Sequence, residues 1–148
     1  MANASITPED GPVAITGASG YIGSWIVQDC VEQGYTVHAC VRDTSKPDKV
    51  NHLSALNEQG PGKVILFEAD LFDRGSYDEA FERCSAVIHA GATVGYNRET
   101  PQEVYDGCFT ENDHVLESVI NAKTIPVSYT HLRAHETDSY LVCRLLLE

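Results

Sequence analysis

Short apolar runs alternate with amphipathic stretches along the first 125 residues. Four runs, rich in valine, isoleucine and alanine, are bounded by glycine or polar residues: Pro12–Thr16, Tyr35–Val41, Lys63–Asp70 and Ala86–Ala92. Apolar runs of this length, without strict polar alternation, are typical of parallel strands buried on both faces. The pattern therefore predicts four buried strands.

Helical spacing fills the intervals between these runs. From Tyr21 to Gln33 the apolar residues are Ile22, Trp25, Ile26, Cys30 and Val31, and Gly34 supplies a stop. A second helix over Lys49–Asn57 would place Val50, Leu53 and Leu56 on one face. A short acidic helix over Ser76–Cys84 would turn Tyr77, Ala80 and Phe81 inward.

The clearest helix start is at Thr100. Thr100 as N-cap, Pro101 at the first helical position and Glu103 three residues after the cap form a capping box with a proline in its favoured place. The helix is expected to run to about Lys123. Its candidate buried residues are Val104, Val115, Leu116, Val119 and Ile120.

Strands and helices alternate in this prediction, and each strand is followed by a helix. Such an order calls for a parallel sheet covered by helices on both faces. The sequence thus predicts an α/β fold of the Rossmann type, a doubly wound parallel sheet, truncated after about four strands and four helices.

Composition narrows the possible partners. The formal net charge of −12 argues against nucleic acid and against an anionic membrane surface. No apolar run approaches the roughly 18 residues of a membrane span. The start, residues 1–12, is polar and acidic and resembles no secretory signal, so a cytoplasmic location is expected. The five cysteines form no C-x-x-C pair, which favours buried thiols over disulfides or a metal site.

The glycine loop "TGASGYIG", Thr16 to Gly23, carries the strongest chemical signal. It lies between the first strand and the first helix, where a dinucleotide-binding loop belongs. Gly17 would allow the tight turn, Gly20 the approach of a pyrophosphate, and Gly23 the close packing of helix on sheet. Ser19 lies within the same loop. The helix N-terminus would then favour the bound anion.

The end of the second strand usually distinguishes NAD from NADP. Arg42 stands there, and a guanidinium can make a bidentate contact with a 2′-phosphate. NADP is therefore the favoured cofactor. NAD is the alternative, with Asp43 as ligand of the ribose hydroxyl, and a solvated charged turn that binds nothing is the third interpretation.

Four motifs in register resemble one family. The glycine loop, "CVRD" after the second strand, "EADL" after the third and "VIHAGA" on the fourth are similar to extended short-chain dehydrogenases/reductases. Within the NAD-dependent epimerase/dehydratase group, the nearest likeness is to dihydroflavonol-reductase-like members. The likeness spans about residues 11–124.

This resemblance implies a set of cofactor contacts. Backbone contacts would come from Tyr21 and Ile22, and Arg42 would meet the 2′-phosphate with Lys49 beside it. Asp70 would accept from the adenine amino group, and Leu71 would pack on the ring. Ala90, Gly91 and Ala92 would pass under the ribose. His89 is interpreted as a structural imidazole rather than a proton carrier.

The catalytic pair of the family is missing. A Tyr-x-x-x-Lys would supply the acid and the lysine that lowers its pKa. None of the seven tyrosines has a lysine four residues later. The full-length parent is expected to transfer hydride between NADP(H) and a small carbonyl or alcohol, whereas this chain is expected to be inactive. An epimerase or dehydratase on the same scaffold and a non-catalytic nucleotide sensor are the alternatives. The pattern identifies neither the substrate nor an oligomeric state.

The last residues follow a different pattern. Val127 to Thr137 resemble the in-frame translation of a transposase-end sequencing adapter, and Leu141 to Glu148 resemble a second adapter segment beyond an index-sized gap. His131, His135, Tyr129 and Tyr140 are therefore not interpreted as site residues. The expected organisation is a polar lead (1–12), a partial NAD(P)-binding domain (13–125) and a non-native tail (126–148).

Overall fold

The computed structural model describes residues 6–92 and 100–125, and the adapter-like segment lies outside these ranges. The described elements are β1 (Val13–Thr16), α1 (Tyr21–Glu32), β2 (Thr36–Val41), α2 (Pro47–Ser54), the 3-10 turn η1 (Ala55–Glu58), β3 (Lys63–Glu68), α3 (Asp78–Phe81), β4 (Ala86–His89) and α4 (Pro101–Ala122). The alternating order matches the order expected from the hydrophobic pattern.

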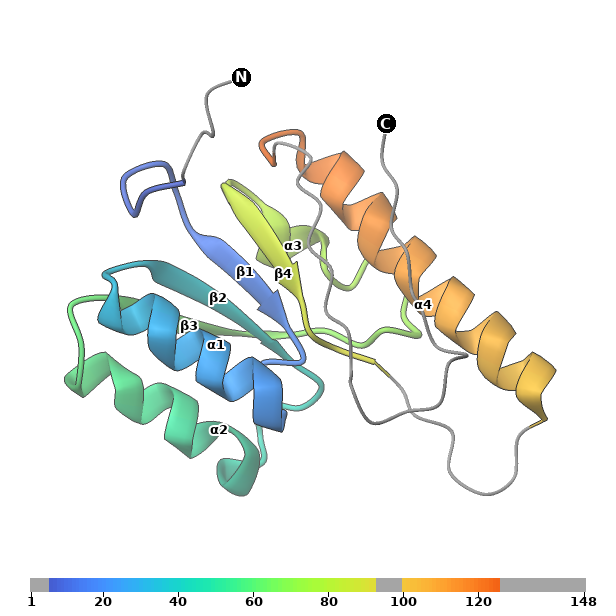
Figure 1. Ribbon diagram of the computed structural model, residues 1–148, viewed down its shortest axis with the longest axis horizontal. Coiled ribbons are helices and arrows are strands. Elements are labelled where there is room, and N and C mark those ends of the chain that lie inside the picture. The colour runs from blue at the N-terminus through green and yellow to red at the C-terminus, as the bar shows by residue number, and fades with distance from the viewer. Residues whose placement is uncertain (1–5, 93–99, 126–148) are drawn as a thin grey trace.

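The four strands form one parallel sheet in the order β3-β2-β1-β4. The chain first adds strands on one side of β1 and then crosses to the other side to form β4. Figure 1 shows α1 and α2 on one side of the sheet and α4 on the other. The prediction of a doubly wound α/β sheet is confirmed.

Two apolar layers hold the helices on the sheet. On the α1–α2 side, Val27, Val31 and Leu53 are almost completely buried against Ile15 and Val37. On the α3–α4 side the buried layer contains Ala14, Cys40, Tyr77, Phe81 and Val115. Full burial of side chains of this size contributes about 1.5–3 kcal/mol each relative to exposure, so these layers are the main source of stability.

The buried faces differ from the predicted ones in two helices. Ile22 and Trp25 of α1 are 57% and 59% exposed, and Ile120 of α4 is 62% exposed. In α1 the innermost residues are Gly23, Val27 and Val31, at four-residue intervals, so Ile22 and Trp25 fall outside that stripe. Ile120 is about 140° around the helix from Val115.

Helix boundaries also differ from the prediction. The helix predicted over Ser76–Cys84 is a single turn, Asp78–Phe81, because the backbone leaves the helical conformation at Glu82 (ψ of 127°) and becomes left-handed at Arg83 (φ of 61°). The second helix begins earlier, at Pro47, and its end tightens into η1. The capping box of α4 is confirmed: the Thr100 side chain accepts from Glu103 N, and Glu103 Oε2 accepts from Thr100 N at 2.7 Å. Within the described ranges, no helix combines the length and apolar character of a bilayer span.

Candidate functional site

Every residue assigned to the cofactor follows the carboxyl end of a strand, apart from Lys49. Parallel strands bring these ends to one edge of the sheet, and ligands of such sheets bind where the strand order reverses. Here the reversal lies between β1 and β4. The glycine loop follows β1, and Ala90, Gly91 and Ala92 follow β4.

Gly17 is constrained by its neighbours across this edge. Its φ of +63° is left-handed, and a Cβ there would lie 2.7 Å from Gly91 Cα and 2.9 Å from the Ala90 carbonyl oxygen. The next residue, Ala18, donates its N–H to Cys40 O at 3.2 Å. The loop after β1 is thus held between the ends of β2 and β4.

Gly23 and Gly20 are constrained differently. A Cβ on Gly23 would overlap the Gly17 carbonyl, so this glycine allows α1 to approach the loop closely. Gly20 has an ordinary extended backbone, with φ of −77° and ψ of 169°. Its Cβ would meet one atom, Gly17 O, at 3.2 Å. The fold itself therefore requires glycine much less at position 20 than at position 17.

The N-terminus of α1 carries no side-chain cap. Gly20 is the N-cap, and the first turn contains no acidic residue. The Ser24 N–H makes the first bond of the helix, to Gly20 O at 2.9 Å. The N–H groups at the start of a helix lack intrahelical acceptors, and their partial positive charge favours an anion. Tyr21 and Ile22 lie in this first turn and are exposed, and Ser19 is half-buried just before it.

At the end of β2, Arg42 and Asp43 have different surroundings. Asp43 Oδ1 accepts from Ser45 N at 2.9 Å and from Ser45 Oγ at 2.6 Å, and Asp43 Oδ2 pairs with Lys46 Nζ at 3.0 Å. The Ser45 hydroxyl and the Lys46 ammonium lower the pKa of Asp43 to about 2. Arg42 is exposed, and no ion pair of its guanidinium occurs within the described ranges.

The residues assigned to the adenine follow β3. Asp70 Oδ1 accepts from Phe72 N at 2.9 Å, which fixes the carboxylate at the start of the loop. Leu71 is half-buried, and its carbonyl oxygen accepts from His114 Nδ1 at 2.9 Å. Lys49 is exposed in the first turn of α2, several residues along the chain from Arg42.

A hydrogen-bonded network anchors the end of β4. His89 Nδ1 lies 2.6 Å from Thr16 Oγ1, and its Nε2 lies 3.1 Å from Asn112 Oδ1. Thr16 Oγ1 also accepts the Gly91 N–H at 3.1 Å. Burial lowers the pKa of His89. With both ring nitrogens engaged, His89 has the surroundings of a structural imidazole.

The sequence prediction gave no role to the Thr16 side chain and did not include Asn112 in this edge. Asn112 lies on α4 three residues before buried Val115, so it faces inward on a stripe that also buries Glu111 and Ser118. A polar residue at an inward helical position usually has a buried partner. That position was the available signal.

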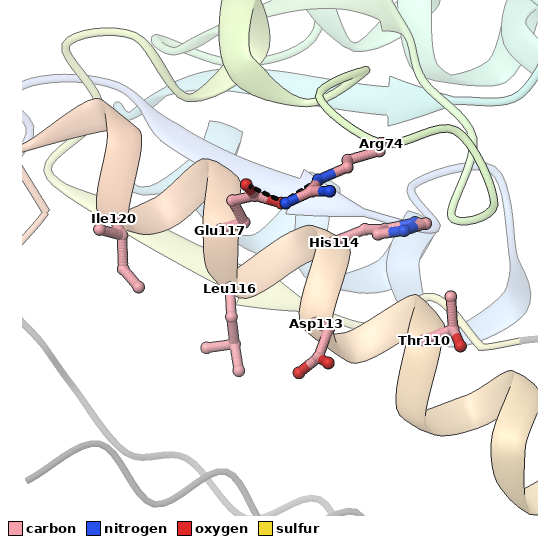
Figure 2. Close-up of a pocket in the computed structure, with 7 residues that line it drawn as sticks. All are labelled: Arg74, Thr110, Asp113, His114, Leu116, Glu117 and Ile120. Atoms are coloured by element: carbon pink, nitrogen blue, oxygen red, sulfur yellow. Dashed lines mark hydrogen bonds and ion pairs between the residues drawn. The ribbon is translucent and has the colours of Figure 1, made fainter.

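The surface depression of Figure 2 contains none of the predicted cofactor residues. It lies along the outer side of α4 and is lined by Arg74, Thr110, Asp113, His114, Leu116, Glu117 and Ile120. In the figure Arg74 and Glu117 point toward each other, and their two hydrogen bonds measure 2.6 and 2.7 Å. The charges of Arg74 and Glu117 neutralise each other, whereas Asp113 adds an exposed carboxylate to the lining. Across the described ranges, no group of histidine, cysteine and acidic residues has the arrangement of a metal site.

Comparison with known proteins identifies the family of this chain. The model of the NAD dependent epimerase/dehydratase family matches residues 13–131. A bifunctional dihydroflavonol 4-reductase/flavanone 4-reductase of Malus domestica is 40% identical over 118 residues, which are 79% of this chain and 34% of that protein. A cinnamoyl-CoA reductase of Medicago truncatula is 36% identical over 114 residues, 76% of this chain and 35% of that protein. The chain thus spans about one third of the length of these curated relatives.

Solved structures share the fold. Vestitone reductase from alfalfa (Medicago sativa) is 29% identical, with a TM-score of 0.58 over 78% of this chain and 34% of that chain. Gre2 from Candida albicans, in complex with NADPH, gives a TM-score of 0.63 at 22% identity over 77% of this chain and 34% of that chain, a likeness of fold alone. Since the family model covers most of the sequence, the chain belongs to the NAD dependent epimerase/dehydratase family.

Proposed function

We propose that this chain carries the nucleotide-binding part of an NADP(H)-dependent reductase that converts a small carbonyl compound to an alcohol. The observation that carries the proposal is the pairing of an uncapped helix N-terminus with an exposed Arg42 at the same edge of the sheet. Together they match the two charged parts of NADP, the pyrophosphate and the 2′-phosphate.

The surroundings of Asp43 favour NADP over NAD. An acid that holds the ribose hydroxyls of NAD must direct its oxygens toward the ligand. Both Asp43 oxygens are instead engaged by Ser45 and Lys46 in its own turn. Asp43 is therefore a poor ribose ligand in this conformation, and Arg42 is the better-placed group for recognition.

One further argument supports a reductase over an epimerase or a dehydratase. The similar plant proteins named above are reductases. The matched part of the family binds the cofactor in both reaction classes, so the assignment rests on those relatives. Because no Tyr-x-x-x-Lys occurs in the 148 residues, we expect cofactor binding without turnover from this chain.

The test measures the affinity of the full chain for NADPH and for NADH, with ligand fluorescence as the signal. Arg42→Ala should weaken NADPH by about 1.5–3 kcal/mol, the contribution of a hydrogen bond to a charged group, and should leave NADH nearly unchanged. Arg83→Ala is the matched control, because Arg83 is exposed and precedes β4 at the opposite edge of the sheet. Equal losses for both nucleotides would contradict the phosphate role of Arg42.

A further inference from the structure

The network at the end of β4 reaches from α4 to the backbone of the proposed nucleotide site. It runs from Asn112 to His89, from His89 to Thr16, and from Thr16 to the N–H of Gly91. Thr16 and His89 are register partners in adjacent strands, so their side chains leave the sheet on the same face. Thr16 is completely buried.

The direction of each hydrogen bond follows from Asn112. Its Nδ2 donates to the Cys108 carbonyl oxygen at 2.8 Å, which can only accept, so Oδ1 faces His89. An amide oxygen accepts only, and His89 Nε2 must therefore carry the hydrogen. Burial keeps the imidazole neutral, because it lowers the pKa of His89. Nδ1 then has no hydrogen and accepts from the Thr16 hydroxyl.

With its hydrogen donated to His89, the Thr16 hydroxyl keeps a lone pair that can accept the Gly91 N–H. Thr16 Oγ1 donates to His89 and accepts from Gly91 at 3.1 Å. Gly91 in turn lies against Gly17, close enough that a Cβ on Gly17 would approach Gly91 Cα to 2.7 Å. A change in the Thr16 hydrogen bonds would therefore move two backbone segments that line the proposed site.

We propose that Asn112 is a positioning residue for the nucleotide site, acting through the tautomer of His89 and the hydroxyl of Thr16 on the backbone at Gly91. The expected effect of Asn112 on NADPH binding rests on the proposed nucleotide function. The network itself is a property of the protein without nucleotide. Asn112 acts on the backbone at Gly91 through its hydrogen bond to His89 and the bonds that follow, from His89 to Thr16 and from Thr16 to Gly91.

The experiment uses the full chain with Asn112→Ala and, as the matched control, Asp113→Ala, the same truncation type at an exposed position of the same helix. Ring ¹⁵N shifts of His89 should show the Nε2–H tautomer in the wild type and in Asp113→Ala. Asn112→Ala should mix the two tautomers and speed exchange of the Gly91 amide. NADPH binding should weaken about tenfold in Asn112→Ala, the effect of one ordinary hydrogen bond.

Thr16→Val removes the hydroxyl at nearly constant volume and tests whether Asn112 acts through it. In that background Asn112→Ala should have little further effect on Gly91 exchange or on NADPH affinity, because the path is already broken. An unchanged tautomer and unchanged Gly91 exchange in Asn112→Ala would overturn the proposal, and so would fully additive losses. If Thr16→Val does not fold, the His89 tautomer in Asn112→Ala alone decides. A wild type that binds no NADPH would refute the proposed function, whereas the tautomer and exchange measurements would still decide the role of Asn112.

Discussion

Gly17 and Gly20 stand three residues apart in one loop, yet different neighbours constrain them. Gly17 combines a left-handed φ of +63° with close approach to Gly91. Gly20 has an extended backbone and one neighbour at 3.2 Å from an added Cβ. The fold explains the first glycine, and we propose that a ligand at the helix N-terminus explains the second.

Alanine substitutions should separate the two roles. Gly17→Ala should lower the free energy of unfolding by about 1–3 kcal/mol, the usual cost of a side chain in a strained backbone region. Gly20→Ala should change unfolding by less than about 1 kcal/mol, but it should weaken NADPH because the new methyl group occupies the approach of the pyrophosphate. Urea denaturation and NADPH titration of both variants provide the measurement. A Gly20→Ala protein that binds NADPH normally would contradict this assignment.

Two buried thiols give the stability a dependence on alkaline pH. Burial raises the pKa of Cys40 and of Cys84 to about 12, from an ordinary value of 9.0. A thiol with a higher pKa in the folded state stabilises the fold while it is protonated. This contribution is complete below the ordinary thiol pKa and is lost as the pH rises from about 9 toward 12.

We therefore expect the urea midpoint to decrease as the pH is raised from 8 to 10.5. This range lies above the pH at which the acidic groups titrate. The Cys40→Ala/Cys84→Ala double variant should show a smaller fall. A residual decline should remain, because burial also raises the pKa of the Tyr77 phenol. An identical pH dependence in the double variant would show that the thiols do not contribute.

At the residue scale, motif spacing assigned the glycines, Arg42 and Asp70 to cofactor binding, which stays a prediction, but it did not indicate the surroundings of these residues. The hydrogen bond and the ion pair of Asp43 depend on the side chains of Ser45 and Lys46, and the motif does not specify how these side chains are oriented. The contacts of His89 depend on Thr16 and Asn112, which are far from it in sequence. Neither arrangement has a periodic signal.

At the scale of elements, local sequence determines where α4 begins, whereas packing against the sheet determines which of its residues are buried. Its start was predictable, because Thr100, Pro101 and Glu103 form a local motif. Its buried face was only partly predictable. Val115 and Val119 pack inward, whereas Ile120 is exposed. Hydrophobicity alone does not define the width of the stripe that reaches the sheet.

The cap of α4 leads to a direct prediction. Thr100→Ala removes the acceptor for Glu103 N and should cost about 1 kcal/mol of stability, a typical value for an N-cap threonine. Thr110→Ala is the control, because Thr110 is exposed in the middle of α4 and its hydroxyl donates to the Asp106 carbonyl of the same helix. Urea midpoints of both variants test the difference. Equal effects would contradict a special role of the cap.

At the scale of the whole molecule, connection rules limit the possible strand orders, but the sequence did not specify which one the chain adopts. Four buried strands joined through helices, with crossovers of fixed hand, leave few arrangements. The observed order β3-β2-β1-β4 places the glycine loop beside the end of β4. This adjacency turns scattered motifs into one candidate site.

We propose that residues 127–148 do not belong to the native protein, because their sequence resembles translated adapter. The match to the family model ends at residue 131, near the beginning of this segment. On this proposal, the nucleotide site depends only on residues before it.

The most direct test of the central claim is to map NADPH onto the backbone amides by NMR, in the full chain and in a form ending at Pro126. The account predicts the same shifts in both forms, concentrated at Gly17–Ile22, Arg42, Asp70–Leu71 and Ala90–Ala92, where the strand ends meet. Shifts confined to the depression between Arg74 and Ile120, shifts that require residues 127–148, or no shifts at all would contradict it.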